Sequence, residues 1–127
     1  MNSATTSAAI VGAHFHPPAR TLLEVLPIGC PLILRREPHN PHDANAIAIF
    51  LEGRNVPEVD GLDEALLGWG TSVAAEKARD EIDLGYIPRD HAADLVHAGF
   101  PLGDVDGSFS VSAGGAPRVR FQSPGGR

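Results

Sequence analysis

The chain has 127 residues, of which 43% are hydrophobic and 20% charged, values that suit one globular domain and exclude wholesale disorder. Its single cysteine, Cys30, excludes an internal disulfide framework and a zinc site of the CxxC type, and it fits a reducing compartment. No stretch approaches the roughly 18 consecutive apolar residues of a membrane span, and the N-terminus lacks the positive region of a signal peptide. We therefore expect a cytoplasmic protein with no membrane association.

The net charge of −6 comes from one segment of the chain. Residues 52–83 hold nine acidic and three basic residues, whereas the rest of the chain holds seven of each. A neutral remainder cannot supply the strong, salt-sensitive affinity of a basic protein for nucleic acid. Recognition of nucleic acid would therefore have to come from a few placed contacts.

The N-terminal part of the chain is predicted to be an arm followed by a short β-like run. Residues 1–8 are small and polar, which predicts a flexible arm. Residues 9–16 alternate in a β-like pattern that ends at the Pro17-Pro18 pair. Residues 21–26 form a short apolar run that fits a strand and a helical turn equally well, because periodicity does not distinguish them at that length.

A β-hairpin pattern follows. Residues 31–37 and residues 46–50 are rich in aliphatic side chains and predict two strands. Between them, residues 38–43 contain two prolines, an asparagine and an aspartate, which is a dense turn signal. The sequence thus predicts two consecutive strands joined by a polar turn.

The acidic segment, residues 52–83, is predicted to be an insertion within a domain that spans residues 9–122. A structureless connection of this length is unusual in a small domain, so we expect part of it to be helical. Residues 62–67 and residues 72–82 are the helical candidates, and Ser72 is a plausible N-cap of the second.

The C-terminal part combines strands with one further helix. Residues 83–87 predict a strand, and residues 89–98 predict a helix that begins after a proline and ends at Gly99. Two more strands are expected at residues 108–111 and 118–121. Residues 123–127 are expected to be a flexible C-terminus.

The most informative stretch joins the two strands of the hairpin. It reads Arg36-Glu37-Pro38-His39-Asn40-Pro41-His42-Asp43-Ala44-Asn45-Ala46-Ile47. An upstream block reads Val11-Gly12-Ala13-His14-Phe15, and a downstream block reads Leu84-Gly85-Tyr86-Ile87-Pro88-Arg89. In this order the three blocks resemble the HIRAN domain, a family found at the N-terminus of fork-remodelling helicases and as stand-alone bacterial proteins. The resemblance covers about residues 10–121, with residues 52–83 as an extra insertion.

The resemblance implies a mainly β fold with a short helix, in the form of a small, OB-like, partly open β-barrel. The family pocket takes the terminal nucleotides of single-stranded DNA at the 3′ end. The expected partners are therefore single-stranded DNA or DNA ends, with a helicase or nuclease as a protein partner in DNA repair or replication-fork processing. No phosphate-binding loop or nucleophile motif accompanies this pattern, so we expect neither an enzyme nor a cofactor.

The residues that match the family pattern have physically reasonable roles in such a pocket. Phe15 matches an aromatic position that stacks a base, and Asp43 matches an acid that accepts a hydrogen bond from a free 3′-hydroxyl. Arg89 matches a basic position that holds a backbone phosphate. His14 replaces a usual basic residue and His42 a common aromatic one. The full set of predicted nucleic-acid-binding residues is His14, Phe15, His16, Arg36, Asn40, His42, Asp43, Tyr86 and Arg89.

Structural roles compete with these binding roles. Asp43 also fits a turn-former that bonds to its own backbone, and Phe15 also fits a core residue, because it alternates with two polar histidines. Arg89 also fits the solvated start of a helix, and Tyr86 a packing residue. Arg35 and Arg36 point to opposite faces of one strand, so we expect one to meet phosphate and the other to form an ion pair.

Two other functions fit parts of the sequence. The first alternative is a protein-interaction module that uses the acidic insertion. The second is a metal-dependent hydrolase, in which His14 and His16 on one strand face bind an ion with His39, His42 or Asp43. The spacing of these histidines matches no closed zinc motif, and we expect no metal.

Overall fold

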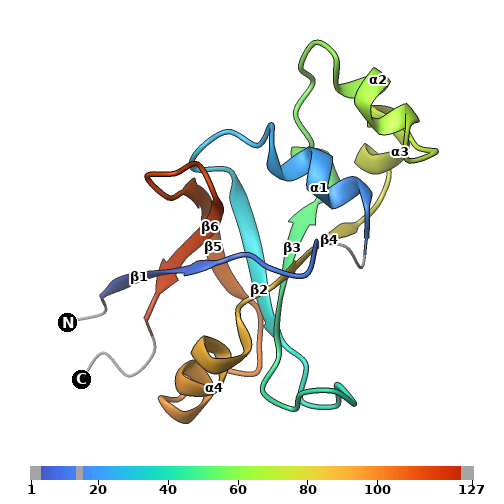
Figure 1. Ribbon diagram of the computed structural model, residues 1–127. Coiled ribbons are helices and arrows are strands. Elements are labelled where there is room, and N and C mark those ends of the chain that lie inside the picture. The colour runs from blue at the N-terminus through green and yellow to red at the C-terminus, as the bar shows by residue number, and fades with distance from the viewer. Residues whose placement is uncertain (1–3, 14–15, 124–127) are drawn as a thin grey trace.

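The structure, a computed structural model, describes residues 4–13 and 16–123 of the chain. Six strands within these ranges form one antiparallel sheet in the order β1-β6-β5-β2-β3-β4 (Figure 1). The strands are β1 (Thr5–Ala9), β2 (Pro31–Arg36), β3 (Ile47–Glu52), β4 (Glu81–Tyr86), β5 (Val105–Val111) and β6 (Pro117–Gln122). The sheet is not closed, so the mainly β, open, OB-like barrel predicted from the sequence is confirmed.

The segment that follows β1 forms hydrogen bonds with strands at both sides of the open sheet. The backbone N–H of Ile10 donates to the Pro117 carbonyl on β6 at 3.2 Å. One residue later, Val11 exchanges two backbone hydrogen bonds with Tyr86 of β4, at 2.8 and 2.7 Å. The segment after β1 therefore passes from β6 at one side of the sheet to β4 at the other.

Gly85 makes this crossing possible. A Cβ atom at position 85 would lie 2.3 Å from the carbonyl oxygen of Val11, and the φ angle of Gly85 is 133°, which L side chains rarely adopt. Glycine is thus required here both for the close backbone approach and for the conformation.

The core forms where alternate strand residues point inward. Ala8 of β1 and Ile10 just after it are buried, whereas Thr5 and Val11 are exposed. The other strands contribute Leu32, Leu34, Ile47, Ile49, Leu51, Ile82, Leu84, Phe109, Val119 and Phe121. These side chains form one continuous apolar cluster.

Four short α-helices and one 3₁₀ turn within the described residues connect the strands. They are α1 (Pro18–Leu23), η2 (Gly53–Asn55), α2 (Leu62–Leu67), α3 (Val73–Lys77) and α4 (Arg89–His97). The sequence left strand and helical turn open for residues 21–26. In the structure the first half of this run is helical, because it belongs to α1, which begins at Pro18 and packs Leu22 into the core. Helix α4 ends before Gly99, whose φ of 102° stops it as predicted.

The predicted flexible arm at residues 1–8 is wrong for residues 5–8. These residues form most of β1, which pairs with β6 from Thr5 opposite Gln122 to Ala9 opposite Arg118. Small polar residues suffice here, because the pairing supplies the backbone hydrogen bonds and Ala8 is fully buried. None of the helices in the described part of the chain has the length and apolar character needed to cross a membrane.

The acidic insertion is partly helical, as predicted, but shorter than its predicted bounds. Its two ends belong to β3 and β4, and the predicted helix at residues 72–82 ends at Lys77 because β4 starts at Glu81. The Ser72 hydroxyl accepts a hydrogen bond from the Ala75 N–H at 3.0 Å, which confirms the N-cap. In Figure 1, α2 and α3 lie at the opposite end of the molecule from α4 and the β2–β3 turn.

Replacing Gly85 with alanine is expected to destabilise the protein by about 3 kcal/mol, because a strained backbone and an overpacked contact each cost roughly 1–3 kcal/mol. Urea unfolding followed by fluorescence of the single tryptophan measures the change. Gly103→Ala is the matched control, since no atom would lie within 4 Å of a Cβ at that position and its φ is not positive. Equal stabilities of the two variants would contradict the role given to Gly85.

Candidate nucleic-acid interface

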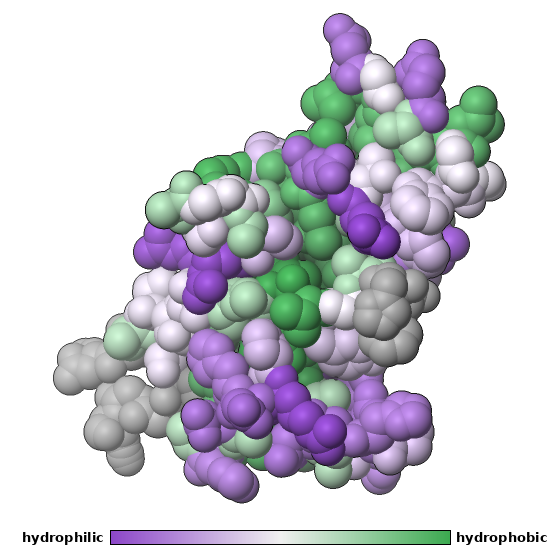
Figure 2. Space-filling model, in the orientation of Figure 1, coloured by the Kyte–Doolittle hydropathy of each residue, from purple (hydrophilic) through white to green (hydrophobic). Residues whose placement is uncertain are grey.

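A pocket of about 310 Å³ lies where the β2–β3 turn, the end of β4 and the start of α4 meet. Its polar residues are Asn40, His42 and Asp43 from the turn, Tyr86 from β4 and Arg89 from α4. Its apolar wall comes from Val11, Ala46 and Ile87. Figure 2 shows hydrophobic residues gathered along the middle of the molecular face and hydrophilic residues along its lower edge. The five polar residues that line this pocket all belong to the nine predicted binding residues.

The turn is held by its own side chains. The Asn40 Oδ1 atom accepts hydrogen bonds from the backbone N–H groups of His42 and Asp43, at 2.8 and 3.2 Å. Asp43 Oδ1 in turn accepts from the Asn45 N–H at 2.9 Å. These Asx-type bonds show that Asp43 forms the turn, and they leave its second oxygen, Oδ2, for another contact.

Arg89 provides that contact. Its Nε atom lies 3.8 Å from Asp43 Oδ2, and its Nη2 donates to the His42 carbonyl at 3.1 Å. The Arg89 side chain is 74% exposed, so the ion pair is screened and weak, and the guanidinium stays accessible to an anion. A cation and a carboxylate therefore stand side by side at the pocket.

Glu37 organises the pocket from behind and was missed as a site residue. Its Oε1 atom accepts hydrogen bonds from Asn40 Nδ2 at 3.0 Å and from the Tyr86 hydroxyl at 2.9 Å. Burial, followed by the bond to Glu37 and its charge, raises the pKa of Tyr86 to about 12. Glu37 lies inside the motif that indicated the site, so its position was available, but its partner on β4 is 49 residues away.

A second carboxylate lies close to this network. Burial, and then the negative charge of Glu37, raises the pKa of Asp83, while His16 opposes the shift. The Oδ1 atom of Asp83 is buried and has no hydrogen-bond partner among the described residues. Negative charge thus accumulates behind Tyr86, which favours a neutral phenol there.

Two predicted binding residues do not line the pocket. His16 Nε2 lies 3.2 Å from Glu76 Oε1 on α3, where it links the segment before α1 to the insertion. Arg36 Nη1 reaches the Phe100 carbonyl at 3.5 Å, beyond α4. The predicted roles of His14 and Phe15 concern positions outside the described residues.

Arg35 is the ion-paired member of the arginine pair. It bonds to Glu81 with Nη1 and Nη2, at 2.9 and 2.6 Å, and to Asp104 with Nε at 2.7 Å. Hydrogen bonds from Arg35 lower the pKa of both acids. The guanidinium also lies over the Phe50 ring, 4.8 Å from its centre, so Arg35 is committed to structure.

The described part of the chain contains no group of three or more His, Cys, Asp or Glu side chains placed to hold a metal ion.

Comparison with protein families finds a match to the HIRAN domain family, which covers residues 4–98, about three quarters of the chain. The HIRAN domain is a family of DNA-binding domains. Neither the curated proteins nor the solved structures yield a match.

Because the protein has a single tyrosine, its phenol can be titrated by absorbance without overlap. We expect a midpoint near pH 12, compared with the ordinary value of 10.0, and a lower midpoint in Glu37→Gln, which removes the negative charge. The folded state holds this proton more tightly than the unfolded chain. The stability contributed by Tyr86 is therefore complete below pH 10 and lost as the pH rises through about 12.

Glu64→Gln, which changes an exposed acid on α2, is the control for this titration. An unshifted phenol in the wild type, or the same midpoint in Glu37→Gln and the wild type, would show that the Glu37–Tyr86 contact does not form in solution.

Proposed function

This chain belongs to the HIRAN domain family, and we propose that it binds single-stranded DNA by its free 3′ end, with the last nucleotide in the pocket beside the β2–β3 turn. The observation that carries the proposal is the pairing of Asp43 and Arg89 at this pocket. One is an acceptor suited to a hydroxyl and the other a cation suited to a phosphate, and they lie 3.8 Å apart.

Asp43 is the group that distinguishes the end of a strand. Its carboxylate is only partly exposed, at 18%, and the Asx turn fixes its orientation. A terminal 3′-hydroxyl can donate a charge-assisted hydrogen bond to Oδ2, whereas a 3′-phosphate or a continuing strand would place negative charge against it. The proposed pocket is therefore selective for a free hydroxyl.

The other pocket residues complete the recognition. Arg89 supports a phosphate contact, because its charge is exposed and its backbone partner at His42 holds it beside the turn. Tyr86 offers an aromatic ring in the pocket wall, and the bond from its hydroxyl to Glu37 fixes that ring. Stacking of a base on an aromatic ring contributes roughly 1–3 kcal/mol.

In the cell, we propose that this module marks exposed 3′ ends during DNA repair or replication-fork processing and presents them to a helicase or nuclease. The family assignment supports a nucleic-acid-binding module rather than an enzyme. The assignment of a pathway follows from the family resemblance, and the chemistry of the pocket is consistent with it.

Binding to short oligonucleotides that differ only at the 3′ end tests the proposal. The wild type is expected to bind a 3′-hydroxyl oligomer at least about tenfold more tightly than its 3′-phosphate counterpart, because hydrogen bonds to charged groups contribute roughly 1.5–3 kcal/mol. Asp43→Asn keeps an oxygen for the Asn45 N–H but removes the charge. We expect this variant to lose most of the preference in a fluorescence anisotropy titration.

Asp90→Asn is the matched control, since Asp90 is an exposed acid in the first turn of α4, adjacent to Arg89. It should keep the preference of the wild type. If wild-type protein binds both oligomers equally, or if Asp90→Asn loses the preference as fully as Asp43→Asn, end recognition by Asp43 is wrong.

A further inference from the structure

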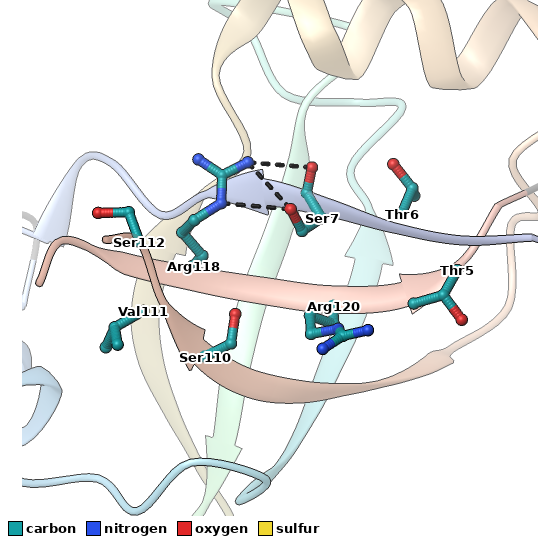
Figure 3. A pocket seen from close by; sticks show the side chains of 8 residues that line it. All are labelled: Thr5, Thr6, Ser7, Ser110, Val111, Ser112, Arg118 and Arg120. Carbon is teal, nitrogen blue, oxygen red and sulfur yellow. Dashed lines mark hydrogen bonds between the residues drawn. The ribbon is translucent and has the colours of Figure 1, made fainter. Parts of the chain in front are cut away.

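A second hollow, of about 440 Å³, lies on the outer face of the sheet across β1, β6 and the end of β5. Its lining contains two arginines, Arg118 and Arg120, and five residues with hydroxyl groups (Figure 3). No acidic side chain of the described residues lines it. In a chain of net charge −6, such a surface is locally positive and rich in hydrogen-bond donors.

The two arginines differ in how far they are committed to the fold. Arg118 donates from Nε and Nη2 to the Ser7 hydroxyl, at 3.3 and 3.1 Å, and from Nη2 to the Ser7 carbonyl at 3.2 Å. Its Nη1 has no partner among the described residues. Arg120 is exposed and has no ion pair or hydrogen bond with any described side chain. Both guanidiniums therefore keep donors for an anion.

The outer face of β1 connects this hollow to the turn pocket. Thr5, Ser7 and Ala9 alternate with buried Ala8, so they share the outer face with Val11, which lines the turn pocket. Ala9 is paired with Arg118 and Ser7 with Arg120. At about 3.3 Å per residue, the distance from Val11 to the level of Arg118 is roughly 7 Å, and to the level of Arg120 roughly 13 Å.

We propose that Arg118 and Arg120 form a track for the phosphodiester backbone of the strand whose 3′ end occupies the turn pocket. This inference rests on the proposed function. At a rise of about 3.4 Å per stacked nucleotide, the span to Arg120 corresponds to roughly four nucleotides, and to fewer in an extended strand. The hydroxyl groups of Ser7 and Ser110 add neutral donors on either side of β6.

An acid on the neighbouring strand β5, Asp106, also sets where the track ends. The hollow that adjoins the arginine face shares Thr5 and Arg120 with it and contains Asp106. An acid there repels phosphate, so contacts with the backbone are expected to stop at Arg120. The bound segment is accordingly short, a few nucleotides on the 5′ side of the terminal one.

Fluorescence anisotropy with 5′-labelled oligothymidines tests the track. A dinucleotide stays short of Arg120, whereas a decanucleotide passes both arginines. We expect the wild type to bind the decanucleotide at least about fivefold more tightly. Arg120→Gln should weaken decanucleotide binding severalfold and leave dinucleotide binding unchanged. The salt dependence should lose a slope of about 0.7 per phosphate contact removed. Arg118→Gln combined with Arg120→Gln should make the two lengths bind alike.

Arg54→Gln is the control, because Arg54 is an exposed arginine on η2 with a 77% exposed side chain, outside both hollows. Equal binding of the two lengths by the wild type, with the 3′-hydroxyl preference intact, would overturn the track and leave the end pocket standing. So would equal losses in Arg120→Gln and Arg54→Gln. Length dependence without any preference at the 3′ end would instead overturn the pocket while the arginine face still binds the strand.

Discussion

The pair of backbone hydrogen bonds between Val11 and Tyr86 is the constraint on which the rest of the structure depends. It brings the segment after β1 against β4, although these are the two ends of the strand order. It also builds the pocket, since Val11 and Tyr86 both line it. The absence of a side chain at Gly85 lets the two backbones approach. Fold and site therefore share one contact, and damage to it removes both.

The polar motif between β2 and β3 closes the turn and also supplies polar side chains to the pocket. Asn40 and Asp43 each use one side-chain oxygen to close the turn, and Glu37 uses one to hold Asn40 and Tyr86 together. These bonds leave Asp43 Oδ2 without a partner in the turn, and Arg89 Nε lies 3.8 Å from it. The structural role of Asp43 therefore does not exclude the proposed binding role, because the turn uses only one of its two carboxylate oxygens.

The sequence predicted those features that depend on local chemistry. Proline, asparagine and glycine positions identified the turn, the start of α4 and its end. The resemblance to the HIRAN domain implied that Asp43 and Arg89 share one pocket, and the structure places both there. Strand β1 was missed, because its small residues carry no apolar period and its stability comes from pairing with β6, more than 100 residues away. For the same reason the arginine face was missed: Ser7 and Arg118 meet only through the β1–β6 register. His16 was misplaced because its partner, Glu76, lies in the insertion.

The distribution of charge reconciles a net charge of −6 with the proposed polyanionic ligand. The acids on α2 and α3, namely Asp63, Glu64 and Glu76, lie at the opposite end of the molecule from the turn pocket, whereas Asp83 lies on β4 close to Glu37 and Tyr86 (Figure 1). The insertion is also fixed there, because Leu62 and Leu66 belong to the core and the buried Glu76 is bonded to Thr71 and His16. At about 0.1 M salt the Debye length is roughly 10 Å, so charges held at the far end of a barrel act weakly on the pocket. Under the proposed function, affinity depends on the few contacts at Asp43, Arg89 and the β6 arginines, and the fixed positions of α2 and α3 keep their negative charge away from the proposed path of the strand.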